Sequence, residues 1–408
     1  MTGTRPRPNV TRRRSASEAT DGLVPRMVAE ARRRAAEGHD VVRLDIGEPD
    51  LPTPAHIVEA GVAALRAGAT RYVAPAGIPP LRAAIADVQR TRGVAATAEQ
   101  VVVTSGAKPM LLYALLALVQ RGDEVLVPDP GYPGYAAAAR IAGARVRHYP
   151  LARDGAQFRL DVDALRAAVR ERTRVLVLNT PQNPTGCVLD DHERLAIAEL
   201  AEERDLWVVS DEIYDGLRYD DRAASSVAAL PGMAARTVVV DGFSKTYAMT
   251  GWRLGYGVMP SSLVPAVTAL VNESTTCAPA FVQHAGLAAL TGPQDDAIAM
   301  RELFRARRDA LVAGLRGVAG VRAEAPDGAF YVFADVAGLL RAGETCVALA
   351  DRLLREHDVA CIPGAAYGRR GEGMLRLAFT TSEERIREAV TRIRAGGQEG
   401  TKRGQEIR

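Results

Sequence analysis

Short apolar runs alternate with longer stretches of helical character over most of this 408-residue chain. Each run is rich in Val and Leu and is too short to form a helix. A parallel strand that is packed between helices is buried on both faces, so it is apolar throughout instead of alternating. The runs therefore predict six parallel strands, at Val101–Val103, Glu124–Val127, Val175–Leu178, Leu206–Val209, Val238–Val240 and Leu254–Val258.

Helical stretches separate several of these strands. They are expected at Pro109–Gln120, Ala136–Ala142, Asp161–Val169 and Asp190–Glu203. Regular alternation of strand and helix is typical of a sheet with helices on both faces. This part of the chain therefore predicts an α/β unit.

The pattern changes after Thr276, where apolar strand runs become sparse. A long helix, two short strands and a further helix are expected there, at Pro293–Leu315, Phe330–Phe333, Met374–Phe379 and Thr345–His357. This mixture predicts a smaller α+β unit. The segment Val41–Asp45 is expected to join it, because that segment connects to the large unit through the proline-rich stretch Pro49–Pro54.

Length and these changes of pattern predict two folded domains with polar ends. At roughly 150 residues per domain, the length allows two or three domains. The expected division is a disordered N-terminal arm at 1–20, the first part of the small domain at 21–50, a large domain at 51–285, a linking helix with the rest of the small domain at 286–396, and a disordered tail at 397–408.

The composition is that of a globular protein and argues against several classes of function. The net charge of +3 is too small for a nucleic-acid-binding surface, and the basic run Thr11–Arg14 is interpreted as part of a disordered leader rather than a binding tail. The four cysteines lack CxxC spacing and the six histidines lack an HExxH pattern, so no metal site is expected. Neither a membrane span nor a secretory signal is evident, so we expect a cytoplasmic protein.

One lysine follows a predicted strand in a setting that suits chemistry. Lys245 comes just after Val238–Val240, on a loop of Gly, Ser and Thr, and Arg253 follows eight residues later. A lysine at a strand end can present its amine for a Schiff base, and a nearby arginine can hold a phosphate. Taken alone, such a lysine is more often a solvated surface residue.

Other predicted strands end in motifs that each have an ordinary structural explanation. Asp211 can cap a helix, and the NPTG motif at Asn183–Gly186 can be a turn. The SGAK motif at Ser105–Lys108 opens a helix whose N-terminus suits a phosphate, and Arg376 interrupts an apolar strand. Because ligands bind at the carboxyl ends of strands in open α/β sheets, we expect the residues that follow these strands to meet in one site.

With GEPD at Gly47–Asp50, these motifs and the string VVVDGFSKTYAMTGWRLGYGV at Val238–Val258 closely resemble the aspartate aminotransferase family of fold-type I pyridoxal-phosphate (PLP) enzymes, particularly its prokaryotic branch. The resemblance extends from about Arg26 to Gly396. It implies an α/β fold with a mostly parallel seven-stranded sheet between helices in the large domain, and a smaller α+β domain. It also implies PLP as cofactor and a homodimer with shared active sites.

The resemblance also assigns roles to individual residues, with Lys245 as the catalytic residue that forms the Schiff base with PLP. The implied cofactor contacts are Asp211 at the pyridine nitrogen, Tyr214 and Asn183 at O3′, Tyr132 stacked on the ring, Gly106, Ala107, Lys108 and Arg253 at the phosphate, and Tyr72 at the phosphate of the neighbouring subunit. The implied substrate contacts are Arg376, Gly47 and Asn183 at the α-carboxylate, Tyr132 beside the ring, and Lys108 at a distal carboxylate.

The expected activity is transfer of an α-amino group between an L-amino acid and a 2-oxo acid in a ping-pong cycle, with glutamate and 2-oxoglutarate, or aspartate, as one pair. An aminotransferase for a neutral or basic amino acid stays open, as does a PLP lyase, decarboxylase or oxidase on the same scaffold. A non-catalytic regulatory module is disfavoured because the arm before Asp21 is too short for a DNA-binding domain. A dinucleotide oxidoreductase is disfavoured because no GxGxxG motif opens the first βα unit.

Overall fold

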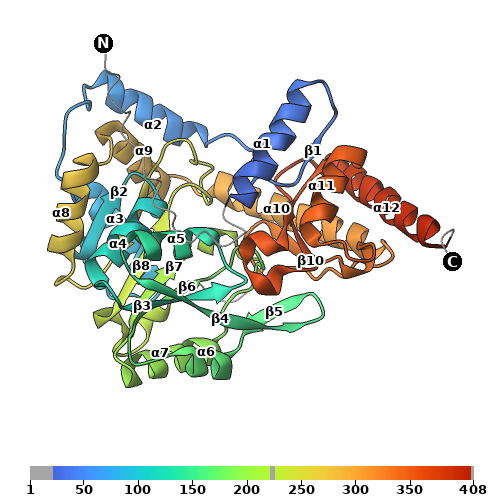
Figure 1. Ribbon diagram of the computed structural model, residues 1–408. Helices are drawn as coiled ribbons and strands as arrows, with labels where there is room; N and C mark the ends of the chain where they lie inside the picture. The colour runs from blue at the N-terminus through green and yellow to red at the C-terminus, as the bar shows by residue number, and fades with distance from the viewer. Residues whose placement is uncertain (1–21, 221–225, 406–408) are drawn as a thin grey trace, which may run out of the picture.

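A computed structural model of the protein describes residues 22–220 and 226–405, with side chains up to residue 397. The expected disordered arm at 1–20 therefore lies outside the described residues. The largest element is an eight-stranded sheet with the order β2-β9-β8-β7-β6-β3-β4-β5 (Figure 1). Its strands are β2 (Val101–Thr104), β3 (Glu124–Asp129), β4 (Arg145–Asp154), β5 (Gln157–Leu160), β6 (Thr173–Asn179), β7 (Trp207–Asp211), β8 (Thr237–Gly242) and β9 (Gly255–Val258).

Most of this sheet is parallel. The pairs β4/β3, β3/β6, β6/β7 and β7/β8 are parallel, and β9 is antiparallel to both β8 and β2, so β2 runs in the same direction as β8. A parallel β9 was predicted, and that prediction is wrong. A parallel neighbour needs a crossover connection, usually a helix, and residues 243–254 between β8 and β9 form no α-helix.

The alternation of side chains along each strand explains why these runs are apolar throughout. In β6, Val175 and Val177 belong to one hydrophobic cluster, whereas Leu176 and Leu178 belong to another on the opposite face of the sheet. Successive side chains of a strand point to opposite faces, so a strand covered on both sides needs apolar residues at every position.

Helices cover both faces of the sheet (Figure 1). Buried residues of α4 (Ala107–Leu118), α5 (Pro133–Ile141) and α8 (Val264–Thr275) share the cluster of Val175. The other face is covered by α6 (Val162–Ala168) and α7 (Asp191–Glu203), and near β2 and β9 by α2 (Ala55–Arg66), α3 (Pro79–Thr91) and α9 (Ala280–Thr291). The α/β architecture expected from the alternating pattern is confirmed.

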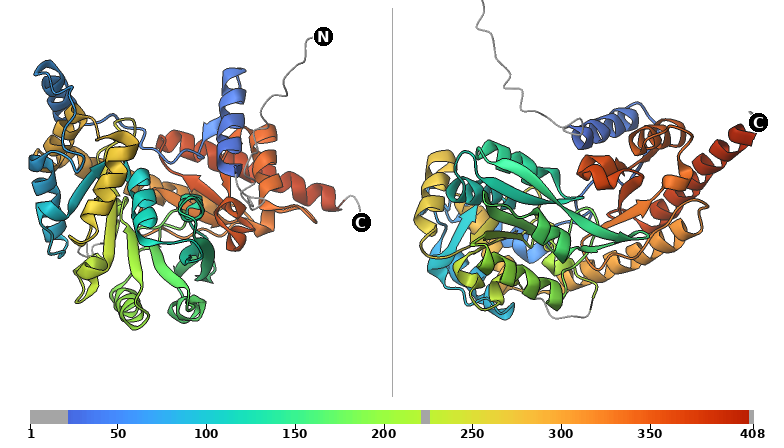
Figure 2. Two further views of the ribbon diagram at one scale, coloured as in Figure 1. Left: turned by 60° about the vertical axis from the view of Figure 1, so that its left-hand side comes forward. Right: turned by 60° about the horizontal axis from the view of Figure 1, so that its bottom comes forward.

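The smaller unit is an α+β assembly beside this sheet. It contains an antiparallel sheet of β10 (Tyr331–Asp335), β13 (Met374–Ala378) and β12 (Ile362–Pro363), and a parallel pair of β1 (Val42–Arg43) and β11 (Val359–Ala360). Its helices are α1 (Leu23–Ala36), α11 (Cys346–His357) and α12 (Glu383–Gln405). Figure 2 shows α10 (Asp295–Arg316) running from the large unit along the smaller one. The predicted domain boundaries stay predictions.

Within the described residues the sheet has eight strands, one more than the resemblance implied, and the six runs read from the sequence did not include β4 and β5. The prediction missed both strands, because β4 reads RVRHYPLARD and carries charged residues on its partly exposed side. The helices α1, α2, α3, α8, α9 and α12 were also not predicted. Helix α12 continues to Gln405, into the segment expected to be a polar tail.

Candidate active site

A cavity of about 360 Å³ lies between the carboxyl ends of the parallel strands and the smaller unit. Ten of the twelve predicted site residues line it: Gly47, Ala107, Lys108, Tyr132, Asn183, Asp211, Tyr214, Lys245, Arg253 and Arg376. Gly106 directly precedes the first residue of α4, and Tyr72 is not among the lining residues. Residues at the strand ends of the large sheet and residues of the smaller unit thus line one cavity. The strand ends meet there because parallel strands have their carboxyl ends at the same edge of a sheet.

Lys245 lies in the turn after β8 and reaches into this cavity. Its Nζ donates a hydrogen bond to the carbonyl oxygen of Gly47 at 2.7 Å and lies 5.6 Å from the centroid of the Phe330 ring. Burial lowers the pKa of Lys245 from 10.5 to about 8, although the nearby Glu48 acts in the opposite direction. The neutral amine, which is the nucleophilic form, is therefore far more populated near neutral pH than in an ordinary lysine.

Asp211 is the last residue of β7 and is held by two donors. The Tyr135 hydroxyl donates to Oδ2 at 2.8 Å, and the backbone N–H of Ile213 donates to Oδ1 at 3.2 Å. Burial raises the pKa of Asp211 to about 6. A cation in the cavity would favour the ionised carboxylate, so this group suits the protonated nitrogen of a heterocycle.

Tyr214 lies behind Asp211 and contacts the smaller unit. Its hydroxyl is 2.9 Å from the hydroxyl of Tyr331 on β10, and burial raises its pKa. The phenol is therefore protonated at neutral pH and available as a donor. A Cβ added to Gly47 would lie 2.3 Å from the Tyr331 hydroxyl, so only glycine allows this segment to approach so closely.

Arg376 enters the cavity from β13 and is buried. Its Nη2 donates to the carbonyl oxygen of Asp45 at 2.7 Å, and its Nη1 is 3.4 Å from Oδ1 of Asn183. The guanidinium carbon lies 4.3 Å from the centroid of the Tyr331 ring. Its Nε is buried and makes no hydrogen bond within the described residues. Such a cation, fixed by backbone and aromatic contacts, suits an incoming carboxylate.

The start of α4 forms a cradle that fits a phosphate. Gly106 has a φ of +101°, and a Cβ at this residue would lie 2.2 Å from Nη2 of Arg253. A Cβ at Gly255 would lie 2.2 Å from the backbone nitrogen of Ala107. The two glycines therefore let Arg253 and β9 approach the first turn of α4. The N–H groups of that turn have no partner inside the helix, and its dipole attracts anions.

Lys108, Tyr132 and Tyr72 are more exposed. The ammonium of Lys108 lies 5.9 Å from the centroid of the Tyr132 ring, and that ring packs edge-on against Tyr135 with centroids 5.3 Å apart. Within the described residues, Lys108 makes no ion pair. Tyr72 is 82% exposed, so its side chain contributes nothing to the cavity of its own chain.

The sequence did not single out several residues of the cavity. Tyr135 lies in the first turn of α5, three residues after the N-cap Tyr132, and no motif singled it out. Tyr331 lay inside a predicted strand without a motif. Helix α1 contributes Val24, Val28 and Arg32, and no local signal marks them.

Comparison with known protein families identifies the family to which this chain belongs. Residues 39–393 match the family described as aminotransferase class I and II. The chain belongs to the class I and II aminotransferases. Enzymes of this family depend on PLP, and the lysine, the buried carboxyl and the glycine-lined cradle fit that cofactor. The expected family, α/β fold, cofactor and amino-group transfer between an amino acid and a 2-oxo acid are therefore confirmed.

Individual relatives in this family are similar over most of their length. The aspartate aminotransferase of Musicola paradisiaca is 40% identical over 89% of this chain and 91% of its own. The arginine–pyruvate transaminase of Pseudomonas aeruginosa is 39% identical over 88% of this chain and 91% of its own. A structure of Thermus thermophilus aspartate aminotransferase with maleate has a TM-score of 0.85 and 37% identity, covering 92% of this chain and 96% of that one.

Two other kinds of feature do not occur in the part of the chain that the structure describes. No helix of that part is both long and apolar enough to cross a membrane. Among the same residues, no group of three or more His, Cys, Asp and Glu side chains is arranged to hold a metal ion.

Proposed function

We propose that this aminotransferase acts on a dicarboxylic amino acid, glutamate or aspartate, with Lys245 as its catalytic residue. The observation that carries the proposal is the meeting of Lys245, Asp211 and Arg376 in one cavity that also holds Lys108 as a further cation. The similar Thermus thermophilus enzyme was solved with maleate, a dicarboxylate, which supports the same substrate class.

Cofactor binding uses residues from several strand ends. PLP supplies an electron-withdrawing ring that delocalises charge from the substrate Cα. Lys245 would attach it covalently, Asp211 would pair with the ring nitrogen, Tyr214 and Asn183 would donate to O3′, and Tyr132 would stack on the ring. Gly106, Ala107, Lys108 and Arg253 surround the phosphate.

Substrate binding uses the two faces of the cavity. Arg376 clamps the α-carboxylate, with Asn183 beside it and the N–H of Gly47 as a further donor. Lys108 projects from α4 toward the substrate side chain. The free amine of Lys245 would move the proton between Cα and C4′, and its lowered pKa suits that exchange near neutral pH.

The identity of the catalytic lysine is tested by covalent trapping. Borohydride reduction of the yellow holoenzyme should fix PLP to Lys245, as read by peptide mass mapping. Lys245→Ala should lower turnover by several orders of magnitude while PLP still binds, because the phosphate cradle and Asp211 are intact. Labelling of another lysine, or an active alanine variant, would overturn the assignment.

The role of Lys108 is tested with pairs of donors that differ only in charge. Lys108→Ala should lower kcat/KM for aspartate on the order of tenfold more than for asparagine, because a charge-assisted hydrogen bond to the distal carboxylate is lost. If Lys108 only supports the phosphate, both donors should lose efficiency together and PLP should dissociate more readily.

Two alternatives to a dicarboxylate transaminase can be tested directly. The first is a transaminase for a basic amino acid, as in the arginine–pyruvate transaminase among the relatives. A panel of amino donors against 2-oxoglutarate, pyruvate and oxaloacetate distinguishes a basic from a dicarboxylic donor. A transaminase yields one equivalent of 2-oxo acid per site in a single turnover, together with the amino form of the cofactor. A lyase or decarboxylase would not.

A homodimer with shared sites is also proposed. Helix α2 exposes Val58, Val62 and Leu65 along one face, at 38%, 37% and 43%, and Tyr72 follows this helix. A second copy packed on this face would bury them and could bring Tyr72 to the neighbouring cavity. A cytoplasmic location stays a prediction.

A further inference from the structure

Helix α1 forms one wall of the active-site cavity. Val24, Val28 and Arg32 line the cavity and are spaced four residues apart, so they follow one face of the helix, one residue per turn. Met27 and Ala31 on the neighbouring face are buried in the core of the smaller unit. The cavity-facing stripe therefore consists of two apolar residues followed by a cation.

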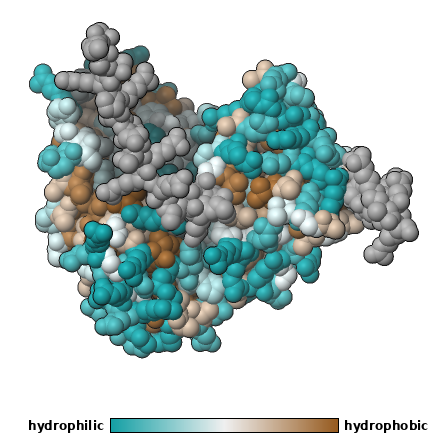
Figure 3. Space-filling view, in the orientation of Figure 1, coloured by the Kyte–Doolittle hydropathy of each residue, from teal (hydrophilic) through white to brown (hydrophobic). Residues whose placement is uncertain are grey.

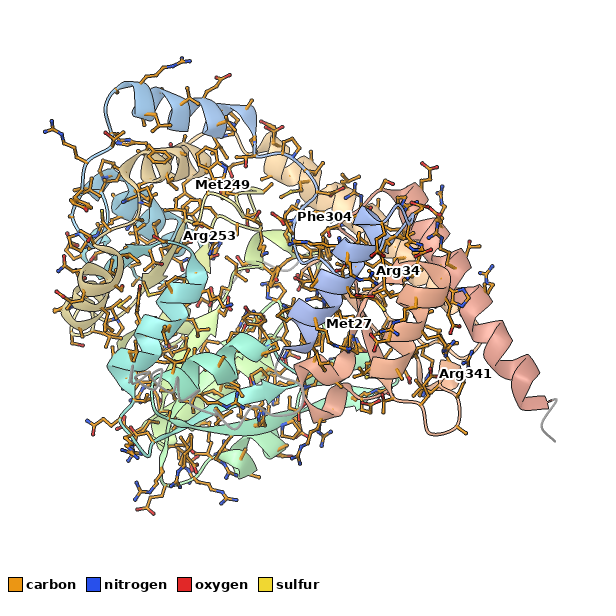
Figure 4. All side chains as sticks on the ribbon, turned by 45° about the horizontal axis from the view of Figure 1, so that its top comes forward. Met27, Arg34, Met249, Arg253, Phe304 and Arg341 are labelled. Atoms are coloured by element: carbon orange, nitrogen blue, oxygen red, sulfur yellow. The ribbon has the colours of Figure 1, made fainter. Side chains whose placement is uncertain are left out.

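The position of α1 is fixed by contacts with α11 and the residue that follows it. Arg34 donates to Asp358 Oδ1 at 2.8 Å and to the Arg355 carbonyl oxygen at 3.1 Å, and Arg26 pairs with Asp351 at 3.4 Å. In Figure 4, α1, which carries the labelled Met27 and Arg34, faces the segment with Arg253 from the opposite side of the view. Arg32 thus belongs to an anchored helix and lines the same cavity as Lys108 of α4.

The charges of the cavity do not balance. Five cations and two acids line it. Both acids already have partners in the chain or in the proposed function: Asp45 accepts two hydrogen bonds from Arg43, at 2.7 and 2.8 Å, and Asp211 serves the cofactor ring. Lys245, Arg253 and Arg376 are assigned to the cofactor and the α-carboxylate, and Lys108 is shared between the phosphate and the distal carboxylate. Among the described residues, Arg32 is the one lining cation without an assigned role.

Arg32 makes no hydrogen bond or ion pair within the described residues, although its neighbours on α1 do. Arg33 pairs with Glu30 and Glu37 along the outer surface of the helix, and Arg34 pairs with Asp358. The exposed surface of α1 is strongly hydrophilic (Figure 3). Two lining cations from different helices, with both lining acids already engaged, favour an anionic group of the ligand and oppose a guanidinium or ammonium group.

We propose that Arg32 is a specificity-determining residue that pairs, from α1, with the side-chain carboxylate of the dicarboxylic substrate, which Lys108 approaches from α4. Val24 and Val28 cover the methylene groups that precede this carboxylate. The inference rests on the proposed function, since it needs the α-carboxylate at Arg376. It also predicts that this chain discriminates against arginine as a donor, unlike the relative named for that substrate.

The test compares glutamate with glutamine, which have nearly the same shape and differ in charge. In the holoenzyme, Arg32→Ala should lower kcat/KM for glutamate on the order of tenfold more than for glutamine, because the lost pair is charge-assisted. Arg32→Lys should restore part of the preference, because it keeps the charge but not the bidentate geometry. Arg32→Glu should reverse the preference between glutamate and arginine relative to the parent enzyme.

Arg33→Ala is the matched control, since it removes the same residue type from the same helix but outside the cavity, and it should leave the glutamate-to-glutamine ratio unchanged. A double-mutant cycle with Lys108→Ala should be non-additive in this ratio if both cations meet the same carboxylate. An unchanged ratio in Arg32→Ala, with transamination of both donors still measurable, would overturn the role of Arg32 and leave the proposed function standing. Loss of transamination in the parent enzyme would instead overturn the proposed function.

Discussion

At the scale of single residues, the site depends on two groups whose pKa values are shifted toward neutrality. Burial lowers the pKa of Lys245 to about 8 and raises that of Asp211 to about 6. Each shift disfavours the charged form in the cofactor-free protein. An attached cofactor whose ring nitrogen carries a proton would relieve the cost at Asp211, so binding and protonation are coupled.

This coupling gives a prediction for the cofactor-free protein. Between pH 8 and 10.5, Lys245 is protonated in the unfolded chain but neutral in the folded chain. The buried ammonium therefore lowers the free energy of unfolding by its full amount below pH 8, and this loss fades as the pH rises toward 10.5. Lys245→Ala should therefore stabilise the apoprotein most at pH 7, and the gain should shrink above pH 8, as measured by urea unfolding. The rate of PLP attachment should rise with pH up to about 8. A pH-independent difference between the two proteins would contradict the shift.

At the scale of elements, the end of α3 is tied to the strand ends beneath the site. Arg92 follows α3 and contacts Asp241 at 2.8 Å, Asp215 at 3.1 Å and Glu212 at 4.0 Å. Asp241 in turn accepts from the Tyr256 hydroxyl at 3.0 Å and from the backbone N–H of Gly242, which lies three residues before Lys245. Burial raises the pKa of Glu212 to about 7. One cation thus supports three acids at the base of the catalytic turn.

Removal of Arg92 should therefore be costly. Arg92→Met should destabilise the protein by roughly 3–5 kcal/mol, because it leaves buried carboxylates without their partner. The loss should be greater at pH 8 than at pH 5, since those carboxyls can take up protons at the lower pH. Arg90→Met, on the exposed side of α3 where Arg90 pairs with Asp87, should cost about 1 kcal/mol or less. Equal losses in the two variants, measured by urea unfolding, would contradict this account.

At the scale of the whole molecule, the two units and the proposed second subunit each supply part of the site. The smaller unit contributes Arg376, Tyr331 and the face of α1, while the strand ends of the large sheet contribute the cofactor residues. Tyr72 and the apolar face of α2 are exposed and contribute nothing to their own cavity, which is what a residue shared between subunits requires.

The shared site is tested with hybrid dimers. Tyr72→Phe should weaken PLP binding, and Lys245→Ala should abolish turnover. When the two inactive or weakened variants are mixed and allowed to exchange subunits, each hybrid contains one site with both Tyr72 and Lys245 intact, so part of the parent activity and affinity should return. No recovery, or a monomer by light scattering, would show that each chain forms its site alone.

The sequence by itself determined the elements and motifs that depend on neighbouring residues. The apolar runs at Val175–Leu178 and Val238–Val240 became buried parallel strands, because burial on both faces leaves a continuous apolar signal. Asp211 ends one strand, and Lys245 and Asn183 come shortly after two others. The rule that parallel strands end at one edge was enough to predict their meeting.

Tertiary structure alone decided the rest. The antiparallel direction of β9 depends on how its connection returns to the sheet, and the partly charged β4 is a strand because it pairs with β3 and β5. Arg32 and Tyr331 enter the site because the smaller unit, which carries α1 and β10, lies beside the large sheet, and no local pattern in the sequence operates over that separation. A sequence motif indicates the chemistry that neighbouring residues can perform. Which charged side chains of the cavity stay unpaired, and so can bind the substrate, depends on residues that are distant in the sequence and become neighbours only in the folded protein.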